Sequence, residues 1–116
     1  MADWYLNTAA GGTNTGGSWV NAFNSTTALA TAFAAMAAGD TLWVNSSSAE
    51  LDSTANKAYT SPGTAAAPCR IISVNTTTNA PPLTGDYLAG ASFTTTTSHT
   101  MSFAGYAYYC GCIFKR

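Results

Sequence analysis

The segment "AAGDTLWV", residues 37–44, is the stretch on which the predicted fold depends. Its first half closes an alanine-rich run with Gly39 and Asp40, which is typical of a turn after a helix. Its second half, with Leu42, Trp43 and Val44, has the apolar and aromatic character of a strand, which we expect over residues 41–45. The sequence therefore passes here from helical to extended structure, and no helical period returns after it.

Upstream of this segment, the run "NSTTALATAFAAMAAGD" predicts one helix, over residues 24–39. Asn24 or Ser25 would be its N-cap, and Gly39 would end it. Apolar side chains recur at three- and four-residue steps and share one face; they are Ala28, Leu29, Ala32, Phe33 and Met36. Because this face is narrow, we expect the helix to cover a flat surface. Leu29, Phe33 and Met36 would be its packing residues.

Residues 1–23 predict an entry strand, at residues 4–6, followed by a glycine-rich turn. The turn "GGTNTGG", residues 11–17, lacks both the lysine of a phosphate-binding loop and the spacing of a dinucleotide fingerprint. We therefore interpret its glycines as those of a surface turn.

Downstream, the remainder of the chain predicts more strands and no further helix. The run "PCRIISVN" (68–75) is rich in β-branched residues, and residues 91–114 hold one or two more strands. Val44, Val74 and Phe103 mark β segments separated by roughly 30 residues, within the range for stacked repeat units. A chain of 116 residues fits one domain, so we expect residues 1–116 to form a single, mainly β domain.

Composition excludes two classes of function. Only 8% of the residues are charged, against roughly 25% in an ordinary globular protein, and the net charge is -1. Four Lys and Arg residues cannot line a phosphate backbone, so we expect no nucleic-acid binding. No window reaches the roughly 18 apolar residues of a membrane span, and the start "MADWYLN" lacks the features of a signal peptide. A polar surface of Ser, Thr, Asn and Gly suits a rigid extracellular or particle-bound protein better than a cytosolic enzyme.

Few residues could carry catalysis. Paired carboxylates would be needed for glycoside hydrolysis, and Glu50 and Asp52 are the only close pair. Because "AELDS" lies between runs of small polar residues, we interpret both as part of a solvated loop. His99 is expected at the surface, and no G-x-S-x-G elbow is present. The sequence therefore predicts no enzymatic activity.

The cysteines predict neither disulfides nor a metal site. Their number is odd (Cys69, Cys110 and Cys112), and a single histidine cannot complete a zinc site, so we expect no metal and no cofactor. Cys110 and Cys112 alternate around Gly111, which would place both thiols on one side of a strand. We expect them inside the protein, packed and inert.

The order of these pieces resembles the entry to right-handed parallel β-helix proteins, found in pectate-lyase-like folds and in bacteriophage tail and capsid proteins. The matching residues are Trp4, Tyr5, Gly16, Gly17, Ser18, Trp19, Ala22, Phe23, Ala37, Gly39, Asp40, Thr41, Trp43 and Val44. The segments "TSPGTAAAPCRIISVN" and "MSFAGYAYYCGCIF" look like the coils that follow. The resemblance implies a short right-handed parallel β-helix, a solenoid-like module with residues 40–116 in about three coils. An N-terminal α-helix would cap its first coil.

The last residues, "YAYYCGCIFKR" (106–116), look like a coil strand with no coil after it. We expect them to form a subunit or capsid interface made of Tyr106, Tyr108, Tyr109, Phe114, Lys115 and Arg116. The two terminal charges would discourage endless edge pairing. The tyrosines could also stack on sugars, although an interface is favoured.

The resemblance implies a non-enzymatic bacteriophage virion structural protein, assembled in the host cytoplasm. We expect a homotrimer that decorates or cements the capsid, with other virion proteins such as the major capsid protein as partners. A tail fibre or spike is the second location. The alternative function is a carbohydrate-binding module or the remnant of a polysaccharide depolymerase. A third is an assembly fragment that pairs with a longer β-helix.

Overall fold

The computed structural model describes residues 1–116 and is mainly β, with one short α-helix near the N-terminus, as the sequence predicted. The helix is α1 (Ala28–Ala35), and a single 3-10 turn, η1, spans Thr84–Asp86. The strands are β1 (Asp3–Leu6), β2 (Thr41–Asn45), β3 (Ala49–Leu51), β4 (Lys57–Thr60), β5 (Cys69–Val74), β6 (Ser92–Thr94), β7 (Met101–Ala104), β8 (Ala107–Cys110) and β9 (Ile113–Lys115). The α-helix, eight residues long, is too short to cross a membrane.

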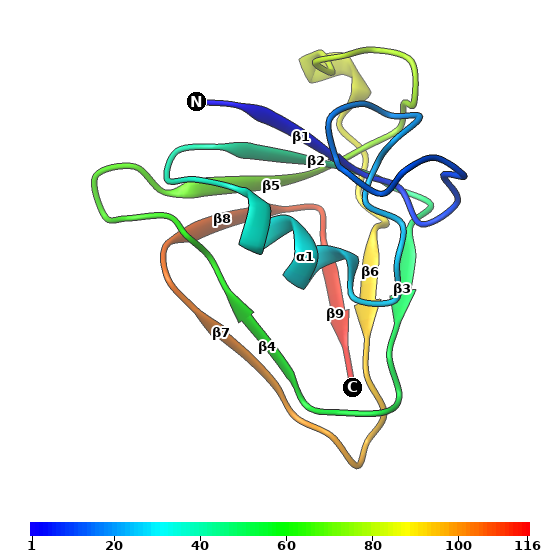
Figure 1. Cartoon of the computed structure of the whole chain (residues 1–116), viewed down its shortest axis with the longest axis vertical. Coiled ribbons are helices and arrows are strands. Elements are labelled where there is room, and N and C mark those ends of the chain that lie inside the picture. The colour runs from blue at the N-terminus through cyan, green and yellow to red at the C-terminus, as the bar shows by residue number, and fades with distance from the viewer.

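The strands form three parallel sheets that the chain visits in rotation. The first sheet has the order β1-β2-β5-β8, the second β3-β6-β9 and the third β4-β7. The first turn of the chain is β2, β3 and β4, the second is β5, β6 and β7, and the last is β8 and β9. The first two turns each contribute one strand to every sheet, and the last turn contributes one strand to the first sheet and one to the second. The three sheets form the sides of a triangle (Figure 1).

Strand register stacks the side chains that point into the triangle. In the first sheet the aligned inward residues are Leu42, Ile71 and Tyr109. In the second they are Glu50, Phe93 and Phe114, and in the third Tyr59 and Phe103. Most of these side chains belong to one hydrophobic core cluster. The interior is therefore a column of aligned residues that runs from the first turn to the last.

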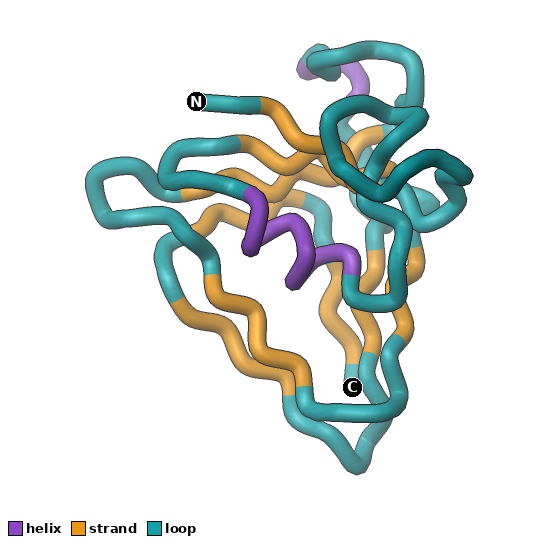
Figure 2. The backbone as a smooth tube through the Cα atoms, in the orientation of Figure 1, coloured by secondary structure: helices purple, strands orange, loops and turns teal.

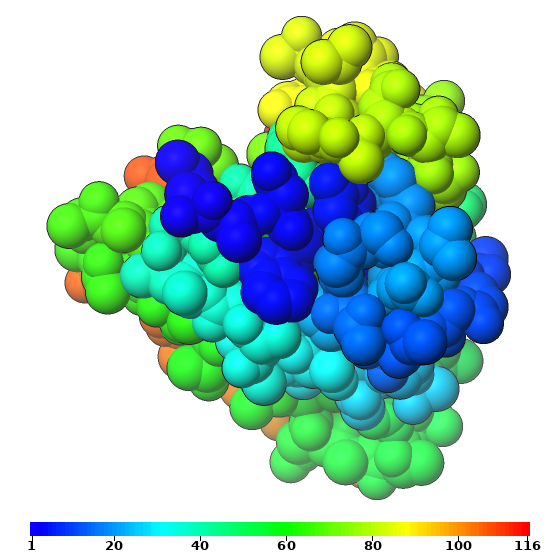
Figure 3. All heavy atoms as spheres, turned by 45° about the horizontal axis from the view of Figure 1, so that its top comes forward, coloured from blue at the N-terminus to red at the C-terminus, as the bar shows by residue number.

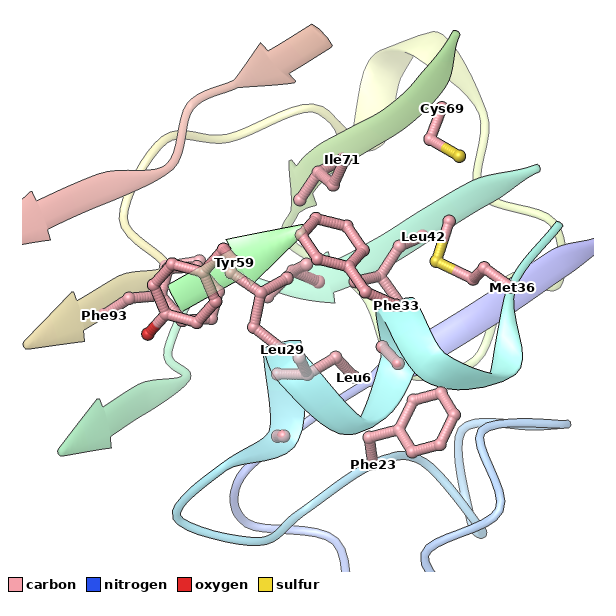
Figure 4. Packing of buried hydrophobic residues seen from close by; sticks show 14 residues of the cluster. Leu6, Phe23, Leu29, Phe33, Met36, Leu42, Tyr59, Cys69, Ile71 and Phe93 are labelled. Atoms are coloured by element: carbon pink, nitrogen blue, oxygen red, sulfur yellow. The ribbon is translucent and has the colours of Figure 1, made fainter. Parts of the chain in front are cut away.

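Helix α1 lies across one end of this column (Figures 1 and 2). Leu29 and Phe33 of the helix, and Met36 directly after it, are buried and face Leu42 and Ile71 of the first sheet (Figure 4). The apolar face that the sequence placed on this helix thus packs over the first turn. It covers the inward residues there and leaves the last turn untouched.

The predicted limits of the helix were wrong. It spans Ala28–Ala35 instead of residues 24–39, and its N-cap is Thr27, with no capping bond from a side chain. The residues just before the helix are held in a loop instead, because Phe23 forms a parallel β-bridge with Leu6 and the Asn24 N–H donates to the side-chain oxygen of Asn14. At the other end, Met36 is already extended, four residues before the turn at Asp40.

The glycine-rich turn, residues 11–17, lies mostly at the surface, as the sequence predicted, but two aromatic residues after it are buried. These are Trp19 and Phe23, and Trp19 packs edge-on against Tyr5, with ring centroids 4.9 Å apart. Gly16 is buried with φ +75°, and a Cβ there would lie 2.1 Å from the ring of Phe23. Trp19 therefore covers the outer face of the first sheet together with Trp43, whereas Phe23 belongs to the inner core cluster.

The second half of the chain holds more strands than the sequence predicted. Residues 91–114 contribute β6, β7, β8 and the start of β9, instead of one or two strands. Strand β3 and strand β4 lie in a region rich in small polar residues. These strands are only three or four residues long, so they carry no readable alternation. These strands are extended because each pairs with a strand in a neighbouring turn of the stack. A local sequence pattern does not encode such pairing.

One excursion interrupts the stack. Residues 75–91, between β5 and β6, leave the triangle and form a lobe that stands apart from the other surface in Figure 3. Several contacts fix the lobe. The indole of Trp19 donates to the Asn79 carbonyl at 2.8 Å, the Asn45 amide donates to the Thr76 carbonyl at 3.2 Å, and Tyr87 forms a β-bridge with Val74. After the lobe, the second turn of the stack continues with β6, which pairs in register with β3.

Candidate functional site

The end of the stack opposite α1 is the strongest candidate for a functional surface. There β7, β8 and β9 are each the outermost strand of a sheet, so one edge of each lacks a neighbour. We call this surface the open end, and define it by the inward residues of β7, β8 and β9 and of the short loop between β8 and β9. These are Met101, Phe103, Tyr109, Cys112 and Phe114.

The aromatic rings of the open end pack against one another. Phe114 is central, with its ring centroid 4.7 Å from that of Phe103 and 5.3 Å from that of Tyr109. It also stacks on Phe93 of the second turn, at 5.4 Å. Phe93 is fully buried, whereas Phe103 is 46% exposed. The difference arises because Phe93 has a turn on both sides and Phe103 has one on only one side.

The outer side of the last turn carries a second set of tyrosines. Tyr108 is 67% exposed and Tyr106 57% exposed. Along β8 the side chains alternate, so Tyr109 points inward while Tyr108 points outward beside Arg70 of β5. The last turn therefore offers two separate aromatic surfaces, one at its end and one on its side.

The residues predicted as an interface divide between these two surfaces. Tyr109 and Phe114 belong to the open end, and Tyr106 and Tyr108 to the side. Lys115 and Arg116 are exposed at the rim, and the Arg116 guanidinium turns back to donate to the Thr97 carbonyl at 3.2 Å. Sequence reasoning missed Phe103, although its place in a β-rich run could have suggested an inward position.

The prediction that both late cysteines are packed inside was wrong. Cys110 ends β8 and is exposed. Gly111 then adopts φ +72°, which turns the chain between β8 and β9, so alternation along one strand does not continue through it. Cys112 is half-buried against the core, and burial, followed by the neighbouring Cys110, raises the pKa of its thiol to about 12.

The end of the stack beneath α1, which we call the closed end, has a buried carboxylate, that of Glu50, at an inward position where the aligned residues of the later turns are apolar. The prediction that Glu50 lies in a solvated loop was wrong, because its side chain points inward from β3 and is 2% exposed. Its carboxylate accepts the Leu29 N–H of the first helical turn, at 2.9 Å, and the Tyr59 hydroxyl at 3.3 Å. The helix thus receives from Glu50 the cap that its own N-terminal residues do not supply.

Lys57 balances the charge of Glu50. Its ammonium lies 3.9 Å from Glu50 and 2.6 Å from Asp52, which sits nearer the solvent. Burial raises the pKa of the Glu50 carboxyl, against the opposing effects of the Leu29 N–H and the Lys57 charge. The hydrogen bond from Lys57 is the main reason that the pKa of Asp52 is lowered. A pocket of about 240 Å³ opens beside Glu50, between Thr8, Asn24 and Leu51.

Asp40 lies in the turn after the helix, as the sequence predicted, and it is buried. Its carboxylate accepts three hydrogen bonds of 2.7–2.9 Å, from the N–H groups of Ala2 and Ala37 and the indole of Trp4. Although burial opposes the shift, these bonds lower the pKa of Asp40. The residue thus ties the N-terminus, the end of α1 and β1 together.

The remaining acidic side chains are also engaged. Asp3 accepts the indole N–H of Trp43 at 2.8 Å, and Asp86 accepts the Asn79 amide and the Leu83 N–H. All five acidic residues therefore accept hydrogen bonds from the protein itself. His99 is half-buried, with its Nε2 3.1 Å from the Ser53 carbonyl, and no three metal-ligating side chains cluster anywhere.

Comparisons with protein-family models, with curated proteins and with solved structures found no match for this chain.

Proposed function

We propose that this chain is a short right-handed parallel β-helix that serves as a non-enzymatic structural module of a bacteriophage particle. The rotation of the chain through three parallel sheets supports the first part, because each turn stacks on the previous one in register. In this proposal α1 caps the first turn and the last turn docks on another component of the particle. Capsid decoration is the preferred location, and a tail fibre or spike is the second.

The open end is the observation that carries this proposal. Three strand edges and a cluster of partly exposed aromatic rings meet there, around Phe103 and Phe114. Exposed edges and apolar surface of this kind are normally covered by another layer of structure. A module with one closed and one open end is suited to attach to a larger assembly.

The state of the carboxylates supports a structural role. A glycosidase needs an acid and a base that face the substrate. Here Glu50 caps α1, Asp40 holds three N–H groups, and Asp52 pairs with Lys57. Each side chain serves a contact within the fold.

Gradient fractionation of a lysate from the source culture tests the function. An antibody against the chain should detect it in the fractions that contain assembled particles, and disruption of the particles should release it. If the chain remains among free proteins in a lysate rich in particles, the proposal is wrong. An abundant soluble host protein, followed in the same fractions, controls for trapping.

Carbohydrate binding is the second candidate, favoured by the exposed side of the last turn. Tyr106 and Tyr108 are more than half exposed, and Arg70 lies beside Tyr108 in the adjacent strand. A glycan array on the purified chain would detect binding. The variant Tyr108→Ser should abolish any signal if this surface stacks on sugars, whereas Phe103→Ser should leave it unchanged.

A further inference from the structure

We propose that the side chains of Lys57 and Asp52 become joined by an amide bond, which the folded chain forms by itself. The bond crosses the loop between β3 and β4, at one corner of the first turn of the stack (Figure 1). This inference goes beyond the proposed function and does not depend on it. It adds a covalent tie between the end of β3 and the start of β4.

The two groups that react are already in contact and are largely shielded from solvent. The Lys57 ammonium donates to Oδ2 of Asp52 at 2.6 Å, and the two side chains are 6% and 13% exposed. A nitrogen at this distance from a carboxylate oxygen lies roughly 3–4 Å from the carboxyl carbon, close to the separation from which a bond forms. The fold therefore holds an amine and a carboxyl group in position to react.

The other oxygen of Asp52 has its own donors. Oδ1 accepts the Thr54 N–H at 2.9 Å and the Thr54 hydroxyl at 2.6 Å, whereas Oδ2 accepts only from Lys57. Donors at such distances stabilise the negative charge that develops on a carbonyl oxygen during acyl transfer. The geometry therefore makes Oδ1 the oxygen that stays in the amide and Oδ2 the oxygen that leaves.

Glu50 is placed to carry protons between these groups. Its Oε1 lies 3.9 Å from the Lys57 nitrogen, and the residue is 2% exposed. The Leu29 N–H and the Tyr59 hydroxyl hold the carboxylate in this position. Burial raises the pKa of Glu50, which makes it a stronger proton acceptor than a solvated carboxylate. Glu50 can therefore act first as a base and then as an acid.

The reaction balances with water as its only by-product. Lys57 passes one proton to Oδ2 through their hydrogen bond, which leaves a neutral amine beside a neutral acid. The amine lone pair forms the bond to Cγ of Asp52, and an electron pair of the C=O bond moves to Oδ1. Glu50 takes a second proton from the nitrogen and delivers it to Oδ2, the Cγ–Oδ2 bond breaks, and water leaves as the C=O bond forms again. The third proton stays on the amide nitrogen, and Glu50 ends as the carboxylate that it was.

The local electrostatics favour the product but slow the reaction. The amide is neutral, so its formation removes two charges whose burial is costly. The hydrogen bond from Lys57 lowers the pKa of Asp52, so the ion pair is the main form of the reactants and the neutral pair is a minor one. The ion pair is therefore the state of the freshly folded chain, and each molecule converts slowly and only once.

Intact-mass spectrometry of the purified native chain tests the inference. After incubation at neutral pH, the mass should fall by that of one water molecule. Trypsin cleaves after Lys and Arg only where the side chain is free, and Lys57 and Arg70 are the first two such residues in the chain. The unfolded product should therefore yield residues 1–70 as one peptide, without cleavage after Lys57.

Lys57→Arg is the matched control. It keeps the positive charge and a site for trypsin, but it has no primary amine to form the amide. This variant should keep its full mass and be cleaved after position 57.

Glu50→Gln tests the proton carrier. The rate at which the mass falls should drop by at least about 100-fold, the usual contribution of general acid–base catalysis. Circular dichroism checks that this variant remains folded, because Glu50 also caps α1. The measurement on the native chain decides the inference even where this variant is unfolded.

Two results would overturn the inference. One is a native chain that keeps its full mass after prolonged incubation and is cleaved after Lys57. The other is a loss of water that Lys57→Arg shares, because the change would then be a cyclic imide at an acidic residue, with the lysine amine free. Neither result bears on whether the chain travels with particles in the gradient, so the two proposals fail separately.

Discussion

The two ends of the stack are built from the same kind of strand but differ in what covers them. At the closed end the inward side chains of the first turn lie under α1, and Leu42 and Tyr59 are fully or almost fully buried. At the open end the aligned residues Tyr109 and Phe103 keep part of their surface in solvent. Burial in this fold therefore depends on the presence of a next layer more than on residue type.

The ends also differ in polarity. The closed end contains Glu50 and Lys57, which are buried, charged and bonded to the helix or to each other. The open end contains aromatic rings and no charge. A buried ion pair tolerates few alternative partners because each group needs its bonds, whereas aromatic surface can pack against many shapes. The closed end is suited to one fixed contact within the chain.

The largest effect should come from the helix. Phe33→Ala removes a buried ring from between α1 and the first turn, which should lower the free energy of unfolding by about 4 kcal/mol. Urea denaturation followed by circular dichroism measures this. A loss below about 1 kcal/mol, the size of an exposed-site change, would show that α1 does not seal the column.

Removal of the charge that balances Glu50 should have the next largest effect. Lys57→Met leaves a buried carboxylate without its cation and should cost about 3 kcal/mol at neutral pH. The pKa of Glu50 is already raised by burial, so its protonated form favours the folded state, and the deficit should shrink as the pH falls through that raised pKa. Asp52→Asn, which removes only the more exposed partner, should change stability far less.

The Asp40 deficit should also shrink on acidification, but over a lower pH range than the Lys57 deficit, because the pKa of Asp40 is lowered and that of Glu50 is raised. Asp40→Asn weakens three hydrogen bonds and should cost about 2 kcal/mol at neutral pH. The pKa of Asp40 is lowered, so its contribution is complete above the ordinary value of 3.8 and disappears as the pH falls through the lower folded value. The native chain and the variant should therefore become equally stable in strong acid. A constant difference would mean that the charge of Asp40 is unimportant.

The smallest effect should be at the open end. Phe103 has the same inward orientation as Tyr59, its aligned neighbour, but is 46% exposed. Phe103→Ala should lower the unfolding free energy of the monomer by only about 1 kcal/mol, measured at a concentration too low for association. A loss as large as that of Phe33→Ala would mean that the two ends are equally sealed.

The sequence predicted the closed end better than the open one. The helix has a readable apolar period, and Leu29, Phe33 and Met36 are buried in the core, although the limits of α1 are shorter than expected. Glu50 was misplaced because a buried carboxylate cannot be distinguished from a solvated one by its neighbours in sequence. Its burial depends on Leu29, 21 residues away, and on Lys57.

At the open end the aromatic character of residues 106–114 was visible, but the division into an inner and an outer set was not. It depends on where each short strand begins, and on the turn at Gly111 that separates Cys110 from Cys112. Strands of three or four residues give no alternation from which to count. The parallel pairing between turns, which fixes their register, is a property of the whole fold.

The lobe at residues 75–91 shows how freely one corner of the triangle can change length. The corresponding corner of the first turn is residues 46–48, and that of the last turn is residues 111–112. The strands that follow these corners, β3, β6 and β9, nevertheless pair in register. This corner is therefore a natural place for grafting a foreign peptide, which would be displayed beside the stack while the column and both its ends remained as they are.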